Sequence, residues 1–307
     1  MSVKNMVRSS LNRFGYDIMK ISTAEQMRQV YGAAFSLPPN SDLGQTLSHV
    51  PPEKQAKMFK ASIKYLCEPF HQAVFFGDRL LTIDKAASFL DDEKFAKSFK
   101  AVVGQHNYDQ YEGTQTISWR LHTLVWAAKN AVHLPGDFVE LGVFKGHMAQ
   151  VVCDNANIES TGKNFLLFDS FEGYSKELSS PEDFAGNPDF FDFANRIYRE
   201  KNIYESVCER FHSRPFVKVI KGFVPDALIG NLPEKIAFLH LDLNSALAEM
   251  KALEVLFDRV SPGGLIIFDD YGWKQYKKLR DTHDKFMNDR GHSILELPTG
   301  QGLVVKR

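Results

Sequence analysis

The sequence has few cysteines and no long apolar run. Only three cysteines occur among the 307 residues, Cys67, Cys153 and Cys208, and their wide spacing excludes a CxxC metal or redox motif. Three thiols cannot all pair within one chain, so we expect reduced cysteines and a cytoplasmic setting. No segment approaches the roughly 20 apolar residues of a membrane span. Charged residues also interrupt the first 20 positions, where a signal peptide requires an unbroken apolar stretch.

The sequence also lacks an excess of charge of one sign. It contains 37 basic and 38 acidic side chains, for a formal net charge of −1. This balance provides no positive field for a polyanion, which excludes a protein that binds nucleic acid non-specifically. The composition, 44% hydrophobic and 24% charged, is that of an ordinary globular protein. We interpret Met1 to Tyr16 as an amphipathic helix on the protein's own surface rather than a membrane anchor.

A change of pattern divides the chain into two predicted domains. From about Thr23 to Val103 the spacing of apolar residues is helical, and Asp84 is placed as the N-cap of one helix. The periodic pattern lapses in a polar stretch, Gly104 to Gly113. We therefore predict an N-terminal helical accessory region over residues 1–112 and a second domain over residues 113–307.

Beyond Gly136 short apolar runs alternate with helical stretches. Near-continuous apolar runs indicate buried parallel strands, and helices between them indicate βα units in a doubly wound, Rossmann-like sheet. The end of the chain differs, because its last two β-like stretches are too close together for a crossover helix and predict an antiparallel hairpin. The expected α/β fold thus has seven strands, mostly parallel: Phe138–Leu141, Phe165–Phe168, Phe216–Ile220, Ile236–Leu241, Leu265–Phe268, His292–Leu297 and Gly302–Lys306. The expected helices include Ile117–Val132, Met148–Asn155 and Ala246–Arg259, and Ser261–Gly264 is expected to be a turn.

The turn after the first predicted strand is the first candidate ligand site. In an open parallel sheet, ligands bind at the carboxyl ends of the strands, where the winding reverses. Glycines in this turn allow a close approach of the backbone, and the following helix offers free N–H groups to a ligand carboxylate. Phe144 stands where a dinucleotide fold has its second glycine, which disfavours pyrophosphate. The candidate residues are Glu140, Leu141, Gly142, Val143 and Gly146; alone, this pattern also suits a simple tight turn.

Two further strand ends suit a nucleoside. Asp169 can accept hydrogen bonds from both hydroxyls of a ribose. Ser170 and Phe171 follow it, and the aromatic ring of Phe171 can flank an adenosine. Asp169 could instead cap the next turn. Gly222 and Phe223 follow the third strand and can lie along an adenine ring. Together the three strand ends favour S-adenosylmethionine (SAM), which combines a nucleoside with a carboxylate and an ammonium group.

Carboxylates gather after the fourth and fifth strands. Asp242, Asp269 and Asp270 should meet at one edge of the sheet, where they repel one another unless a cation joins them. Oxygen ligands favour Mg²⁺, although capping of helices is an alternative role. For methyl transfer to a hydroxyl, Asp242 is the predicted general base, and His240 is a rival base on the same side of the strand.

Three motifs resemble those of the macrocin-type O-methyltransferases, which are class I SAM-dependent methyltransferases: Gly136-Asp-Phe-Val-Glu-Leu-Gly-Val-Phe-Lys-Gly146, Phe168-Asp-Ser-Phe-Glu-Gly173 and Ser261-Pro-Gly-Gly-Leu-Ile-Ile-Phe-Asp-Asp-Tyr-Gly272. The resemblance covers roughly Ile117 to the C-terminus. It implies SAM-dependent, Mg²⁺-assisted methylation of sugar hydroxyls, with Asp242, Asp269 and Asp270 as metal ligands. The chain departs from the family at Asn244, where a second aspartate is usual, so the substrate contacts there must differ.

Three other functions remain open at this stage. A catechol- or phenol-type methyltransferase shares the fold and a similar ligand set. The altered motif at Asn244 also suits a SAM-binding protein without catalysis, whereas a nicotinamide oxidoreductase is disfavoured by the missing G-x-G-x-x-G. The aromatic-rich segment between the second and third strands predicts either a lid near the acceptor or a packing or dimer surface: Phe184, Phe190, Phe191, Phe193 and Tyr198, with Asp183, Asp189, Asp192 and Arg196. We expect a homo-oligomer with a small hydroxyl-bearing acceptor, a saccharide.

Overall fold

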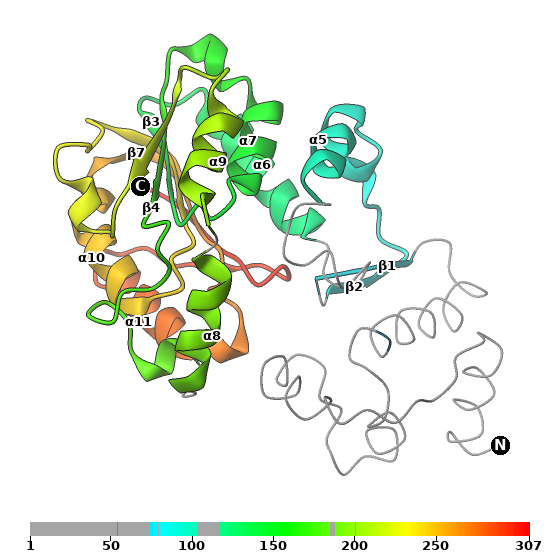
Figure 1. Cartoon of the computed structure of the whole chain (residues 1–307). Coiled ribbons are helices and arrows are strands. Elements are labelled where there is room, and N and C mark those ends of the chain that lie inside the picture. Colours follow the sequence, from blue (N-terminus) through cyan, green and yellow to red (C-terminus); the bar gives the residue numbers. More distant parts are fainter. Residues whose placement is uncertain (1–53, 55–73, 79, 104–116, 185–187, 200) are drawn as a thin grey trace, which may run out of the picture. The chain divides into compact units, whose positions relative to one another are not determined.

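The computed structural model describes residue 54 and residues 74–78, 80–103, 117–184, 188–199 and 201–307 (Figure 1). The predicted helix Met1 to Tyr16 and the polar stretch Gly104 to Gly113 lie outside the described residues. The chain divides into two compact units, one of Met1–Ser88 with Asn107–Ile117 and one of Phe89–His106 with Ser118–Arg307. The domain boundary near residue 112 stays a prediction.

The described residues of the first unit include a β-hairpin. Strand β1 (Val74–Gly77) pairs antiparallel with β2 (Leu80–Ile83), so the expectation that the whole region from Thr23 to Val103 is helical is wrong here. Runs of four residues are too short for periodicity to distinguish a strand from a helix. The tight connection places Asp78 at φ 48°, a backbone conformation that aspartate tolerates better than most residues.

The second unit begins with helix α5 (Glu93–Val103), which packs on α7 (His147–Ala156). Its N-terminus is capped by Asp92, whose Oδ1 accepts a hydrogen bond of 2.8 Å from the backbone N–H of Phe95. Asp84 is not the N-cap that the sequence pattern suggested, because only a 3₁₀ segment, Ser88–Leu90, forms where a helix over Ala86 to Leu90 was expected. Its backbone is left-handed, with φ 54°, whereas an N-cap residue is normally extended.

The centre of the second unit is the predicted seven-stranded sheet, in the order β5-β4-β3-β6-β7-β9-β8. Its five parallel strands are β3 (Asp137–Leu141), β4 (Phe165–Asp169), β5 (Val217–Lys221), β6 (Ile236–Leu241) and β7 (Val260–Phe268). The closing hairpin is confirmed, because β9 (Gly302–Val305) runs antiparallel to both β7 and β8 (Leu295–Glu296). The winding reverses between β3 and β6, the place where ligands bind in such sheets.

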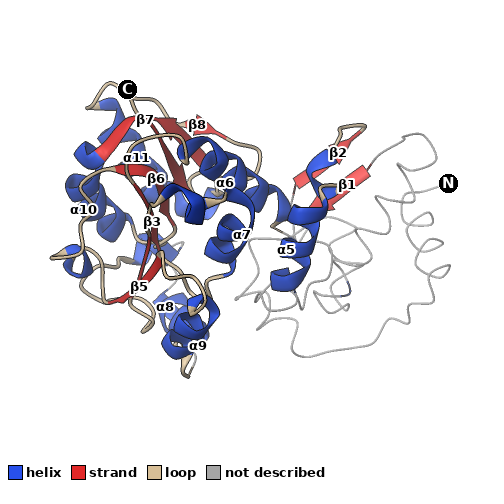
Figure 2. Cartoon of the chain, turned by 90° about the horizontal axis from the view of Figure 1, so that it is seen from above, coloured by secondary structure: helices blue, strands red, loops and turns tan. Residues whose placement is uncertain are grey.

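Helices cover both faces of this sheet (Figure 2). Helices α6 (Ser118–Ala131) and α7 lie on one face, and α10 (Ala246–Leu256) and α11 (Lys277–Asn288) lie on the other. Helix α8 (Pro188–Tyr198) lies within the predicted aromatic-rich insertion between β4 and β5, and α9 (Ile203–Phe211) follows it before β5. Short 3₁₀ segments complete the unit at Ile158–Thr161, Pro181–Phe184, Asp226–Leu228, Phe257–Arg259 and Lys274–Tyr276.

The core explains why the strands appear as unbroken apolar runs. All six residues of β6 are buried, as expected of a strand covered on both faces. The predicted turn Ser261–Gly264 lies inside β7, as an irregularity where the pairing with β6 shifts from Val260 to Leu265. Among the described residues, the structure contains no helix with the length and apolar character needed to cross a membrane.

Candidate active site at the carboxyl edge of the sheet

The ends of five strands are aligned by hydrogen bonds that continue the sheet beyond its last residues. The backbone N–H of Asp242 donates to the carbonyl of Leu141 at 2.8 Å, and that of Asp269 donates to the carbonyl of Leu241 at 2.9 Å. On the other side of β3, Gly142 is bonded to Phe168, and Gly222 to Asp169. The predicted site residues therefore emerge side by side along one edge.

Gly142 is required by the close approach of the β6 end. Its φ is 87°, and a Cβ atom there would lie 2.0 Å from the carbonyl oxygen of Asp242. Gly146, with φ 74°, precedes helix α7. Leu141, directly before Gly142, and Val143, directly after it, are buried. The turn thus presents backbone rather than side chains, as a ligand carboxylate requires.

The Asp169 carboxylate holds the turn after β3 in place by hydrogen bonds. Its Oδ2 accepts from the N–H groups of Val143 and Phe144 at 2.7 and 2.8 Å, and its Oδ1 accepts from that of Phe171 at 2.6 Å. A carboxylate offers about four acceptor positions, so these three bonds leave one for a ribose hydroxyl in this arrangement. The neighbouring Ser170 hydroxyl donates to the carbonyl of Gly173 and closes its own turn.

Backbone strain is concentrated at these strand ends. Phe144, Phe171 and Asn244 all adopt left-handed backbone conformations, with φ between 46° and 55°. For residues that carry a Cβ, such conformations cost of order 1–3 kcal/mol and persist where the surroundings enforce them, which is often at functional sites. Strained residues therefore follow three adjacent strands, β4, β3 and β6.

Aromatic rings lie around the strand ends that are predicted to bind the methyl donor. The ring of Tyr198 lies with its centroid 5.0 Å from that of Phe144 and 5.5 Å from that of Tyr174. On the β4 side, Phe171 contacts Tyr204 at 5.3 Å. At the end of β5, Gly222 has φ 151°, and its neighbour Phe223 is partly buried. Helix α8 thus brings Tyr198 to the β3 turn, and α9 brings Tyr204 to Phe171 on the predicted nucleoside side.

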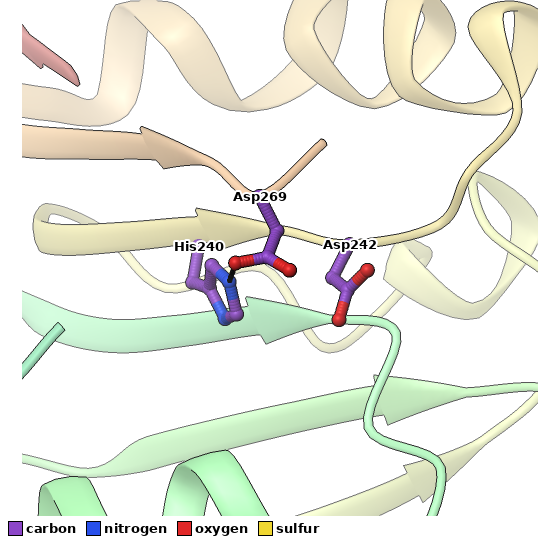
Figure 3. Close-up of side chains that lie close together, drawn as sticks. All are labelled: His240, Asp242 and Asp269. Carbon is purple, nitrogen blue, oxygen red and sulfur yellow. Dashed lines mark ion pairs between the residues drawn. The ribbon is translucent and has the colours of Figure 1, made fainter. Parts of the chain in front are cut away.

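An acidic cluster occupies the β6 and β7 ends (Figure 3). His240 is fully buried, with Nδ1 3.1 Å from Oε2 of Glu140 and Nε2 3.6 Å from Oδ1 of Asp269. The second distance exceeds hydrogen-bond length, so that contact is purely electrostatic. His240, Asp242 and Asp269 each have one atom that could bind a metal ion. These three atoms all lie within 4.8 Å of one another.

Two residues that the sequence pattern did not indicate hold this cluster. Arg120 of α6 places Nη1 2.5 Å from Oδ2 of Asp269 and 3.3 Å from Oδ1 of Asp270. Gln301, in the β8–β9 connection, donates from Nε2 to Oδ1 of Asp269 at 2.8 Å. Asp270 therefore faces Arg120, whereas Asp269 is held from both sides.

The charges of the cluster follow from burial and these contacts. Burial opposes ionisation of Asp269, but Arg120 and His240 outweigh it and hold the pKa of Asp269 below its usual range. Burial would lower the pKa of His240, yet the carboxylates of Asp269 and Glu140 raise it to about 10. Burial raises the pKa of Glu140, although the contact of Glu140 with His240 acts in the opposite direction.

Asp242 stands apart from these pairs. Burial, followed by the charges of Asp269 and Asp270, raises the pKa of Asp242 well above its usual value. Asp242 is nevertheless only partly buried as a residue, whereas Asp269 is 1% exposed. The structure argues against the rival prediction that His240 is the base, because a buried imidazole with a pKa near 10 is already protonated at neutral pH.

Comparisons with known proteins find similarity over a large part of the chain. Residues 100–295 match the model of the macrocin-O-methyltransferase (TylF) family. Over 150 residues the chain is 28% identical to an 8-demethyl-8-(2,3-dimethoxy-alpha-L-rhamnosyl)-tetracenomycin-C 4'-O-methyltransferase of Streptomyces olivaceus. Over 162 residues it is 25% identical to a mycinamicin III 3''-O-methyltransferase of Micromonospora griseorubida.

These matches cover only part of each protein. They span 45% and 50% of this chain, and 54% and 62% of the two relatives. Among solved structures, the O-methyltransferase NovP superposes with a TM-score of 0.57 at 18% identity, over 69% of this chain and 97% of NovP. That likeness concerns the fold.

Proposed function

The chain belongs to the macrocin O-methyltransferase (TylF) family, and from that membership we propose that it transfers a methyl group from SAM to a hydroxyl group of a sugar. The curated relatives are a rhamnosyl 4'-O-methyltransferase and a mycinamicin 3''-O-methyltransferase, which supports a glycosylated metabolite or saccharide as the acceptor. The observation that carries the proposal is the alignment of the Gly142 turn with Asp242 along one edge of the sheet.

The donor would bind across the β4 and β3 ends. The turn from Glu140 to Gly146 would hold the amino-acid part of SAM, and the backbone N–H groups at the start of α7 suit its carboxylate. Asp169, with one acceptor position left, would bind the ribose. Phe171 and the residues Gly222 and Phe223 would enclose the adenosine.

The transfer itself is an in-line displacement. The acceptor oxygen attacks the methyl carbon, the carbon–sulfur bond breaks, and SAM leaves as neutral S-adenosylhomocysteine. The hydroxyl proton would pass to Asp242, because a raised carboxyl pKa makes a better proton acceptor. Arg120 and His240 would remain charged and hold Asp269 in place throughout.

The acidic cluster fits a divalent cation. Asp242 and Asp269 offer oxygen atoms within 4.8 Å of each other, and oxygen ligands suit Mg²⁺. Among the described residues, Asp269 and Asp270 face the cationic side chains Arg120 and His240, whereas burial raises the pKa of Asp242. A cation at this place would therefore bind together with the loss of a proton from Asp242. We propose that Asp242 and Asp269, with Asp270 beside them, hold Mg²⁺, which when bound would make an acceptor hydroxyl more acidic.

Three predictions accompany the proposal and have their own measurements. Light scattering of the purified protein tests the expected homo-oligomer. Cell fractionation tests the cytoplasmic location, and limited proteolysis tests the domain boundary near residue 112.

An acceptor comparison tests the proposal. The full chain would be incubated with methyl-labelled SAM and Mg²⁺, with either methyl α-L-rhamnopyranoside, a rhamnosylated polyketide or catechol as the acceptor. We expect label in a glycoside and little in catechol. Label in catechol alone would favour the catechol-type alternative. SAM binding by calorimetry without transfer to any acceptor would favour the non-catalytic alternative that Asn244 suggests.

A further inference from the structure

A buried carboxylate lies behind the β6 end. Glu249, in the first turns of α10, is 1% exposed. Its Oε1 accepts hydrogen bonds of 3.0 Å from the backbone N–H groups of both Leu243 and Asn244. These are the two residues that directly follow Asp242.

The other oxygen of Glu249 faces helix α11. It lies 2.9 Å from Nε2 of His283, a side chain that is also buried. The imidazole of His283 in turn packs on Phe268, the last residue of β7, with ring centroids 4.3 Å apart. His283 thus lies beside the second oxygen of Glu249 and is itself packed against the end of β7.

The segment that Glu249 holds is strained and carries the reacting side chain. Asn244 has φ 55°, and its Nδ2 donates to Oδ1 of Asp242 at 3.2 Å. The two bonds from Glu249 offset the cost of that backbone conformation, because hydrogen bonds to a charged group are stronger than neutral ones. The helix has its own cap in Ser245, whose Oγ accepts from the N–H of Ala248 at 3.2 Å. Holding the helix end therefore does not require Glu249.

We infer that Glu249, backed by His283, is a positioning residue that sets the place of Asp242 and Asn244 for methyl transfer. This inference rests on the proposed function. Glu249 makes no contact with the reacting atoms and acts through the backbone of residues 243 and 244. A displacement of about 1 Å at a reacting group can lower the rate by a factor of about 100, so a small shift of this segment is enough.

The test compares Glu249→Ala with Glu249→Gln by steady-state kinetics on the acceptor that the wild type methylates. We expect Glu249→Ala to lower kcat at least tenfold, with the dissociation constant of SAM within threefold of the wild-type value. Glu249→Gln keeps an oxygen for the two N–H groups and should recover most of the lost kcat. His283→Leu should resemble Glu249→Ala.

Asn155→Ala is the matched control. Asn155 is also buried, and its side chain bonds the carbonyl of Val151 within α7, away from the strand ends. If Glu249→Ala loses no more kcat than Asn155→Ala at equal thermal stability, the inference is overturned. It is equally overturned if Glu249→Gln is no better than Glu249→Ala. A wild-type protein that binds SAM but methylates no acceptor contradicts the proposed function instead. In that case the amide hydrogen exchange of residues 243 and 244 decides the inference, because Glu249→Ala must accelerate it and Glu249→Gln must restore it.

Discussion

The guanidinium of Arg120 lies 2.5 Å from the carboxylate of Asp269, across 149 positions of the sequence. This pair joins helix α6 to the end of β7 and supplies a fixed positive charge to the acidic cluster. The ion pair is buried, with side-chain exposures of 6% and 1%. Its two members therefore depend on each other far more than an exposed pair would.

Arg120→Ala should destabilise the protein and reduce methyl transfer. Removing one partner of a buried ion pair leaves an unmatched charge and costs about 3–5 kcal/mol. Chemical unfolding measures that loss. Arg120→Lys restores a point charge but not the contact with both Asp269 and Asp270. Its activity should therefore lie between that of the wild type and that of Arg120→Ala. Equal stability of Arg120→Ala and the wild type would contradict the role of this pair.

His240 should make the protein less stable at alkaline pH. Its pKa is about 10 in the folded protein against 6.5 as the ordinary value, so its contribution to stability is complete below about pH 6.5. The contribution is lost as the pH rises through 10, because the folded state must release the extra proton. The Tm of the wild type should fall more steeply between pH 7 and pH 10 than that of His240→Gln. Parallel curves would show that His240 is not the protonated group.

Gly142→Ala should be far more damaging than Gly162→Ala. Both glycines have positive φ angles, 87° and 70°, and so incur a similar backbone cost. A Cβ at position 142 would meet the Asp242 carbonyl at 2.0 Å, whereas nothing lies within 4 Å of one at position 162. We expect Gly142→Ala to weaken SAM binding at least tenfold by calorimetry and Gly162→Ala to leave it unchanged. Similar SAM affinities for the two variants would place the donor elsewhere.

Binding of Mg²⁺ should release protons. Burial, followed by the neighbouring carboxylates, raises the pKa of Asp242, and a cation favours its ionised form, so Mg²⁺ should bind more tightly as the pH increases. Calorimetry in two buffers of different ionisation enthalpy measures the released proton. Asp242→Asn should abolish the release, and the exposed Asp91→Asn should not. Mg²⁺ binding that is unchanged between pH 6 and pH 8 would argue against the cation site.

Much of the fold could be predicted because buried parallel strands leave a plain sequence pattern. The predicted Ile236–Leu241 coincides with β6, and the predictions for β3 and β4 are each within one residue. Strands that end together also bring the residues after them together, so the grouping of Asp242 with Asp269 followed from topology.

The residues that support the site were harder to predict. Arg120 lies one helical turn before Leu124 on the buried stripe of α6, and a charged residue on such a stripe was the available signal. In the sequence alone, Glu249 looks like an ordinary exposed residue of a helix. Gln301 lies in a connection between strands, where no periodic pattern indicates burial. Their roles depend on contacts between segments distant in the sequence, which composition and spacing do not record.

The central claim is that Asp242, beside the Gly142 turn, receives the proton of a sugar hydroxyl as the methyl group is transferred. Its most direct test is transfer of a ¹³C-methyl group from SAM to methyl α-L-rhamnopyranoside or a rhamnosylated polyketide, followed by NMR of the product. The account predicts one new O-methyl signal with the wild type and with Asp91→Asn, and at least a hundredfold slower transfer with Asp242→Asn despite unchanged SAM binding. Transfer at the wild-type rate by Asp242→Asn would contradict it.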